Sequence, residues 1–341
     1  MKDFMGNYSL FLAKALTIAL TVSVVLAIGV AILESDNDSS AGYISVKKLN
    51  DRYEAITLEM KKHLLSADEY EKAAAVADAA KEAAEGEKAG RKRVFVLSFS
   101  GDLAASAVAG LREEISAVLG VATPEDEVIV RLESGGGMVH SYGLAASQLQ
   151  RIRDRNIPLT IAVDKIAASG GYMMACVGDR LVAAPFAIIG SVGVIFSTPN
   201  FHRFLQKHDI DYEQITAGEY KRTLTLFGQI TEKGRDKTIA QVQAVHDLFK
   251  QFIAAHRKSV DMEKVATGEF WYASQALNLK LVDELMTSDD LLRARSRTAD
   301  LYEVTWQPNQ TLSQQLSASV RLMVSDLFMG LWQLAAESRY Q

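Results

Sequence analysis

The sequence has almost no cysteine. Cys176 is the only one among 341 residues, and it lies in an apolar stretch. A single cysteine excludes a disulfide within the chain and a cysteine-based metal site. In such surroundings a lone cysteine usually packs as a small buried hydrophobic residue, and we expect this of Cys176.

An excess of positive charge is also missing. The chain has 37 Lys and Arg against 42 Asp and Glu, which gives a formal net charge of −5. This balance offers no general surface for polyanions, so nucleic acid is not an expected partner. Hydrophobic residues make up 48% of the chain, which is ordinary for one large or two modest globular domains.

Charged residues are absent from the apolar run between Ala15 and Leu33. The run is about as long as a membrane-spanning helix, which takes ~20 residues. Lys2 and Lys14 precede it and acidic residues follow it, so the positive-inside rule predicts a cytoplasmic N-terminus. A cleaved signal peptide is the alternative, but its apolar core is usually shorter and its small-x-small cleavage site is not evident here. We expect an uncleaved single-pass anchor in residues 1–36, with residues 15–33 in membrane lipid.

Proline is absent from Ser45 to Arg93, where alanine, glutamate and lysine dominate. This composition predicts helix with a solvated face, or a partly helical spacer, and we assign residues 37–93 to it. Residues 301–341 are expected to form a C-terminal helical extension, amphipathic from Leu312 to Ala336. That stretch is too polar for a clear membrane span, so it packs on protein or lies on the membrane surface, and we favour packing.

Between the spacer and the C-terminal extension, strand-like and helical patterns alternate. Apolar runs predict five strands, at residues 94–99, 127–134, 158–164, 180–185 and 193–199. Helical spacing follows the first two strands, and a long amphipathic helix is expected over 231–260. This alternation indicates an α/β fold with a mainly parallel sheet covered on both faces.

Two of the strands lead into small-residue turns that open a helix, "ESGGGM" at 133–138 and "AASGGYMMA" at 167–175. Such turns expose unpaired backbone N–H groups at the positive end of a helix dipole, where they can hold an anion or a transient oxyanion. The GxGxxG spacing and a Walker lysine are both missing, so a nucleotide site is disfavoured. Ser169 in the second turn is either a helix N-cap or, with a base nearby, a nucleophile.

Two candidate bases are available for such a serine. His140 is the only histidine placed plausibly for a triad, just after the first glycine turn. The other candidate is Lys221, in "TAGEYKRTLTLFG". A lysine acts as a base only when its amine is neutral, which requires desolvation or neighbouring positive charge. Apolar residues flank Lys221 and Arg222 adjoins it, although most lysines are simply solvated surface charges.

Five motifs together match a known family. They are "ESGGGM", "AASGGYMMA", "GSVGV", "TAGEYKRTLT" and "ATGEFWYASQA…LVDE". Their order and spacing resemble those of the signal-peptide-peptidase-like serine peptidases, over the anchor and from Val94 to about Asp290. The resemblance implies a ClpP/crotonase-like domain over 94–300, a Ser–Lys dyad and homo-oligomeric rings in which a site can borrow residues from a neighbour.

Carried over by position, Ser169 resembles the nucleophile of that family and Lys221 resembles its general base. The N–H group of Gly170 and one from the Gly136–Gly137 turn resemble the oxyanion hole. Ser191 in "GSVGV" resembles the hydroxyl that orients the lysine.

Three positions depart from the family pattern. Gly135 stands where the family usually has proline, which predicts a looser turn before the oxyanion hole. Ala273 and Lys280 occupy positions where small or glycine residues are common, away from the dyad.

The expected function is that of a membrane-anchored serine endopeptidase facing the periplasm from a bacterial inner membrane. Ser169 attacks a peptide carbonyl of a peptide or protein substrate, Lys221 takes the proton, and water resolves the acyl-enzyme. No metal or organic cofactor is implied. Two alternatives stay open: a crotonase-type acyl-thioester enzyme, and a catalytically silent membrane scaffold.

Overall fold

The structure is a computed structural model that describes residues 42–86 and 91–309, with Lys14, Leu16, Thr17, Leu20, Thr21 and Ser23. Contacts divide the chain into two units, and the larger, Ile44–Trp306, holds the candidate site. The expected amphipathic stretch from Leu312 to Ala336 lies outside the described residues, as does most of the expected anchor. Within the described parts of the chain, no helix combines the length and apolar character that a membrane span requires.

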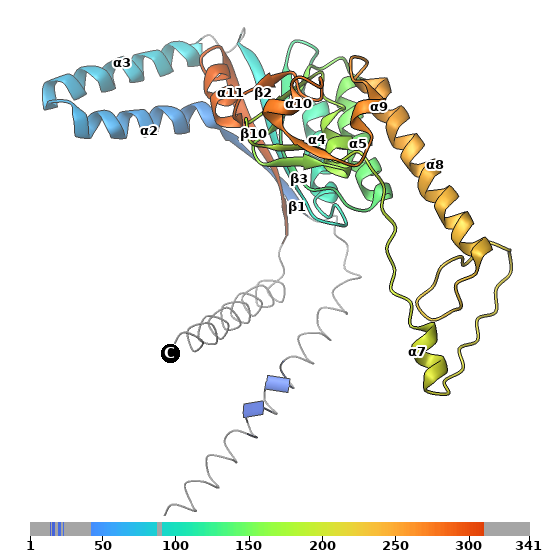
Figure 1. Cartoon of the computed structure of the whole chain (residues 1–341). Helices are drawn as coiled ribbons and strands as arrows, with labels where there is room; N and C mark the ends of the chain where they lie inside the picture. Colours follow the sequence, from blue (N-terminus) through green and yellow to red (C-terminus); the bar gives the residue numbers. More distant parts are fainter. Residues whose placement is uncertain are drawn as a thin grey trace, which may run out of the picture. The chain divides into compact units, whose positions relative to one another are not determined.

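Ten strands of the described chain form one sheet (Figure 1). The main path runs in the order β1 (Gly42–Lys48), β10 (Ala299–Pro308), β2 (Lys92–Gly101), β3 (Glu127–Ser134), β4 (Leu159–Val163), β6 (Arg180–Ala183) and β9 (Glu284–Leu285). The pairs from β10 to β9 are all parallel. The sheet therefore has the expected mainly parallel α/β character.

A short branch of the sheet carries the candidate site. Strand β5 (Ile166–Ala168) pairs with the last residue of β3 and with β7 (Ile188–Gly190). Strand β7 in turn pairs antiparallel with β8 (Phe270–Tyr272). The branch brings the carboxyl ends of β3 and β5 together, because Ser134 and Ala167 are register partners.

Helices bury both faces of the sheet. The larger apolar cluster joins one face to α4 (Val108–Leu119), α5 (Val139–Arg153), α6 (Gly170–Ala175) and the end of α8 (Glu232–His256). A smaller cluster joins the other face to the start of α2 (Leu49–Leu64) and to α11 (Ser288–Arg295). Further helices of the described range 42–309 are α3 (Ala67–Gly86), α7 (His202–Lys207), α9 (Met262–Val265) and α10 (Ala273–Ala276).

The charged spacer is helical in α2 and α3, as expected, but its described residues before α2 are not helical. Ser45–Lys48 lie in β1, and Ile44 there packs against the main core. Likewise Leu301–Pro308 belong to β10 and not to a helix, because alternate residues face the two clusters: Leu301 lies in one and Val304 in the other.

The strand expected at 193–199 is also wrong. These residues have no regular secondary structure, and the strand lies earlier, at β7. Ile195 and Phe196 are 86% and 53% exposed, so within the described chain their apolar side chains face solvent.

Candidate active site

Ser169 forms a sharp junction between β5 and α6. Its φ is 53° and its ψ is −120°, a combination that residues with a side chain rarely adopt. The Ser169 N–H donates to the Gly190 carbonyl at 2.8 Å, and its carbonyl accepts from the Met173 N–H at 3.0 Å. The side chain makes no capping bond, so the N-cap alternative is not realised. A partly buried serine on a strained strand-to-helix turn is the arrangement that presents a nucleophile in many hydrolases.

The two glycine turns lie against each other. Gly136 has φ +88°, and a Cβ there would lie 2.6 Å from the Gly170 nitrogen and 2.8 Å from the Ser169 Cβ. Only glycine fits this position, because a side chain would meet backbone and strain φ together. The structure thus brings together Gly136, Gly170 and Ser169, three of the residues predicted for the site.

The three N–H groups predicted for the oxyanion hole differ in whether they already have a hydrogen-bond partner. The Gly136 N–H already donates to Ser134 Oγ, at 3.1 Å. The N–H groups of Gly137 and Gly170 have no hydrogen-bond partner in the described part of the chain. These two groups are therefore the donors free to receive an oxyanion.

Ser191 lies next to this junction, directly after the residue that bonds Ser169. Its φ is 51°, and its N–H donates to the Glu269 carbonyl at 2.7 Å. The Ser191 hydroxyl lies 3.4 Å from the Gly268 carbonyl oxygen, a long contact at the limit of a hydrogen bond. Ser191 is therefore beside the junction, with its hydroxyl directed to backbone.

Lys221 lies apart from this cluster, in the loop between α7 and α8. Its side chain is exposed, and no contact joins it to Ser169 in the described chain. Its neighbour Thr223 contacts α8 at Gly234, whereas Val192, beside Ser191, contacts α8 at His246. Gly234 and His246 are separated by about 18 Å of helix axis, at 1.5 Å rise per residue. Figure 1 likewise shows α7 beyond the N-terminal end of α8, away from the sheet.

Apolar residues flank Lys221 in the sequence, but in the structure their side chains are open to solvent. Tyr220, Leu226 and Phe227 are each about 40% exposed, at 41%, 43% and 40%. Lys233 and Lys237 lie over the Tyr220 ring, 5.8 and 5.0 Å from its centroid. Within the described residues of one copy, Lys221 therefore lacks the desolvation that a neutral lysine requires.

Other candidates behave as the sequence suggested. His140 is exposed on α5, and the described chain shows no contact between it and Ser169. Cys176 is fully buried, and burial raises the pKa of its thiol, so it is an unreactive core residue.

Two residues of the site were not singled out from the sequence. Ser134 and Tyr142 are both buried, and their hydroxyl oxygens lie 2.6 Å apart beneath the glycine turns. Burial raises the pKa of Tyr142, so its hydroxyl keeps its proton. Both residues lie in "ESGGGMVHSYG", but a buried serine and tyrosine usually belong to the core, and no local pattern distinguishes these two.

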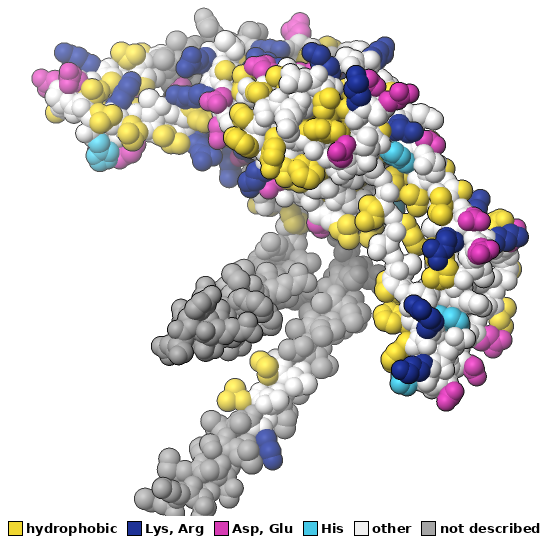
Figure 2. Space-filling model, in the orientation of Figure 1, with side chains coloured by type: hydrophobic (Ala, Val, Ile, Leu, Met, Phe, Trp, Pro, Cys, Tyr) yellow, Lys and Arg dark blue, Asp and Glu magenta, His cyan; other side chains and the backbone are white. Residues whose placement is uncertain are grey.

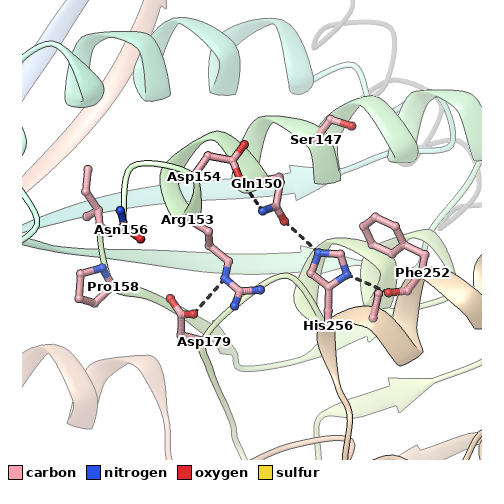
Figure 3. A pocket seen from close by; sticks show the side chains of 11 residues that line it. Ser147, Gln150, Arg153, Asp154, Asn156, Pro158, Asp179, Phe252 and His256 are labelled. Carbon is pink, nitrogen blue, oxygen red and sulfur yellow. Dashed lines mark hydrogen bonds and ion pairs between the residues drawn. The ribbon is translucent and has the colours of Figure 1, made fainter.

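A separate pocket lies at the opposite ends of the strands (Figure 3). It contains the Arg153–Asp179 ion pair, at 2.9 Å, and a contact of 2.9 Å between His256 Nε2 and Gln150 Oε1. Asp179 also accepts from the N–H of Leu159, the first residue of β4. The pocket therefore lies where strands begin, and it joins α5 to the end of α8.

Comparison with known proteins decides the class. Residues 3–149 match the family described as Peptidase family S49 N-terminal, and residues 151–302 match Peptidase family S49. The chain belongs to peptidase family S49. It is therefore a peptidase, and a serine mechanism is consistent with the family.

Relatives within family S49 cover nearly the whole chain. "Probable protease SohB" of Haemophilus influenzae is 43% identical over 326 residues, 92% of each chain. "Probable protease SohB" of Buchnera aphidicola subsp. Acyrthosiphon pisum is 44% identical over 330 residues, 96% of this chain and 97% of the relative. "Protease 4" of Haemophilus influenzae is 24% identical over 196 residues, 54% of this chain and 32% of the relative. The family resemblance drawn from the motifs is thus confirmed.

Proposed function

We propose that this S49 peptidase is a membrane-anchored serine endopeptidase in which Ser169 is the nucleophile and Lys221 is the general base. The observation that carries the proposal is the Ser169 junction. Ser169 is a partly buried serine on a strained turn that packs against Gly136, and the N–H groups of Gly137 and Gly170 are unpartnered in the described chain. A nucleophile beside preorganised donors suits acyl transfer, in which negative charge develops on the carbonyl oxygen.

The reaction follows from these groups. The Lys221 amine takes the Ser169 proton as Oγ bonds to the scissile carbonyl carbon, and the oxyanion accepts from the two N–H groups. The C–N bond then breaks, and Lys221 gives its proton to the leaving amine. A water molecule next attacks the acyl-enzyme, and Lys221 takes a proton from this water. The ester bond to Ser169 breaks, and the proton returns to Oγ.

In this proposal Lys221 comes from a neighbouring copy in a ring-like oligomer. The segment that carries it shows many exposed apolar side chains, and Figure 2 shows hydrophobic side chains on the surface around α7. They include Ile195, Phe196, Phe201, Phe204, Ile210 and Ile215. Exposed apolar surface on this scale is typical of a protein interface. Burial against another copy supplies the desolvation that the Lys221 amine needs.

The remaining features of the proposal rest on the sequence. We assign the chain a ClpP/crotonase-like catalytic domain over 94–300, because its motif order resembles that of the family. Residues 1–36 form a single-pass anchor in a bacterial inner membrane, residues 37–93 a spacer and residues 301–341 an extension. The charges around the apolar run direct the catalytic domain to the periplasm. Relatives named as proteases support peptides or proteins as substrates.

Hydrolysis of casein by the full-length chain in detergent tests the proposal. Ser169→Ala should abolish both hydrolysis and covalent labelling by a fluorophosphonate. Ser147→Ala, which removes an exposed hydroxyl from α5, is the matched control and should leave both unchanged. Casein hydrolysis that survives in Ser169→Ala would show that the nucleophile lies elsewhere.

A further inference from the structure

Tyr142 joins three parts of the chain beneath the candidate site. Its side chain is fully buried in α5, and its hydroxyl donates to the Asp102 carbonyl at 2.7 Å. The same hydroxyl lies 2.6 Å from Ser134 Oγ, and Ser134 Oγ accepts from the Gly136 N–H at 3.1 Å. A chain of three hydrogen bonds thus runs from the first glycine turn to the loop after β2.

The direction of this chain is fixed by the protons available. A carbonyl oxygen can only accept, so the single Tyr142 proton points to Asp102. Ser134 must therefore supply the proton of its bond with Tyr142. The Ser134 oxygen is left as the acceptor for the Gly136 N–H. Every hydroxyl donates once and accepts once, so the chain has one arrangement and is fully satisfied.

The far end of this chain of hydrogen bonds, at Asp102, is itself held in place. The Asp102 carboxylate accepts from the Ser106 N–H at 2.8 Å and from the Ser106 hydroxyl at 2.7 Å. These bonds hold the pKa of Asp102 below its usual range, because both stabilise the charged carboxylate. The Tyr142 hydroxyl therefore donates to a backbone carbonyl of fixed position.

Tyr142 and Ser134 also contact the second glycine turn. A Cβ on Gly170 would lie 2.5 Å from Tyr142 Cγ, so the aromatic ring lies directly against this residue. A Cβ on Gly171 would lie 2.3 Å from the Ser134 carbonyl oxygen. The ring of Tyr142 and the backbone of Ser134 thus contact the start of α6, which carries the second free N–H.

We infer that Tyr142 and Ser134 are positioning residues that set the geometry of the oxyanion hole. The inference rests on the proposed function of Ser169. By binding the Gly136 N–H, Ser134 fixes that peptide, and the next N–H, of Gly137, is left free for the substrate. The ring of Tyr142 holds Gly170 at the required distance. Neither side chain touches substrate, and both act through backbone donors.

This role predicts a specific kinetic defect. Oxyanion donors act on the transition state more than on the bound substrate, so their displacement lowers kcat and leaves KM nearly unchanged. Small errors in the position of reacting groups cost up to roughly 100-fold in rate. Tyr142→Phe keeps the ring against Gly170 and removes only the hydroxyl, so we expect kcat to fall roughly 10-fold or more with KM within about twofold.

Tyr172→Phe is the matched control. Tyr172 is also fully buried, and its hydroxyl also donates to a backbone carbonyl, that of Leu281, at 2.9 Å. Tyr142→Phe and Tyr172→Phe each remove one hydroxyl oxygen from the core, but the Tyr172 hydroxyl takes no part in the chain of hydrogen bonds that reaches Gly136. A general loss of core stability should appear in both variants, whereas the fall in kcat should appear in Tyr142→Phe alone.

The test measures kcat and KM for a fluorogenic peptide with full-length protein in detergent, together with the thermal midpoint of each variant. Ser134→Ala, which breaks the same chain at its centre, should reproduce the defect and replaces Tyr142→Phe if that variant does not fold. A peptide aldehyde, whose adduct places an oxygen in the hole, should bind both variants at least about tenfold more weakly than it binds Tyr172→Phe.

Two results would overturn the inference. If Tyr142→Phe and Ser134→Ala match Tyr172→Phe in kcat and aldehyde binding while Ser169→Ala is inactive, the hydroxyl chain has no role in catalysis. If Ser169→Ala itself retains full hydrolysis, the proposed nucleophile is wrong, and the positioning role falls with it.

Discussion

Gly136 lies so close to Gly170 that a Cβ on the first would be 2.6 Å from the backbone nitrogen of the second. Backbone from two distant turns, one after β3 and one after β5, meets at this point. No side chain fills the contact, and the neighbouring N–H groups of Gly137 and Gly170 stay unpartnered in the described chain. The contact therefore ties the alignment of both free donors to one pair of residues.

Gly136→Ala should inactivate the peptidase. The new methyl would strain a φ of +88° and press on the Gly170 nitrogen, which displaces one of the two donors. We expect hydrolysis to fall on the order of 100-fold or more, as in loss of an oxyanion donor. The control is Gly143→Ala in α5, where a Cβ meets nothing within 4 Å. It should keep full activity and gain up to about 1 kcal/mol of stability. Equal activity in both variants would contradict this description of the hole.

Lys221→Arg should be inactive while remaining folded. Arginine keeps the charge but cannot lose a proton at working pH, so it cannot act as a base. Loss of general-base catalysis costs roughly 10²–10⁴-fold in rate. Lys221 is exposed within the fold of its own copy, so the substitution should leave that fold intact. Lys237→Arg, a partly buried neighbour that lies over Tyr220, is the control and should be fully active. An active Lys221→Arg alongside an inactive His140→Ala would replace the dyad with a triad.

Gly135→Pro should stabilise the fold and keep activity. A Cβ at this position would lie 3.7 Å from Ile166 Cδ1, an ordinary contact. We expect a gain of about 0.4–1 kcal/mol in the free energy of unfolding, because the unfolded chain loses freedom. Failure to fold would show that the turn has a backbone angle that proline cannot adopt.

Glu114→Gln should stabilise the protein at neutral pH. Glu114 is 6% exposed in α4, one carboxylate oxygen accepts from the Trp306 N–H at 2.8 Å, and the other has no partner in the described chain. Burial raises the pKa of Glu114 in the fold. The stability that the Glu114 carboxyl group contributes to the wild-type protein is thus fully present below the unfolded pKa of about 4.3. It is lost as the pH rises through the raised pKa of the folded state.

The corresponding measurement is the unfolding midpoint of both proteins from pH 4 to pH 8. The advantage of Glu114→Gln should be largest at the alkaline end and should shrink toward pH 4. An advantage that is independent of pH would mean that burial of the charge is not its cause.

Much of the fold was predictable, because strands buried on both faces have continuous apolar runs. The run at Glu127–Ser134 predicted β3 with its observed bounds. The run at 193–199 has the same appearance, but Ile195 and Phe196 are exposed in the described chain. A single sequence does not distinguish apolar residues that face a sheet from those that face another molecule.

The site was predictable only in part, for a related reason. Ser169 and its glycines form a local pattern, so the sequence placed them. The chain of hydrogen bonds through Tyr142 depends on contacts between β3, α5 and the loop at Asp102, which lies 40 residues from Tyr142. No spacing rule predicts those contacts. The separation of Lys221 from Ser169 likewise follows from the length of α8 and not from any motif.

Mixing two inactive variants tests most directly whether the Ser169–Lys221 dyad is shared between copies. Differently tagged Ser169→Ala and Lys221→Arg chains should be co-expressed, purified through both tags and assayed for peptide hydrolysis. If Lys221 of one copy serves Ser169 of the next, about a quarter of the sites in a random closed ring hold both wild-type residues, and activity should return to roughly that fraction. Mixed assemblies that carry both tags and hydrolyse nothing would contradict a dyad shared between copies.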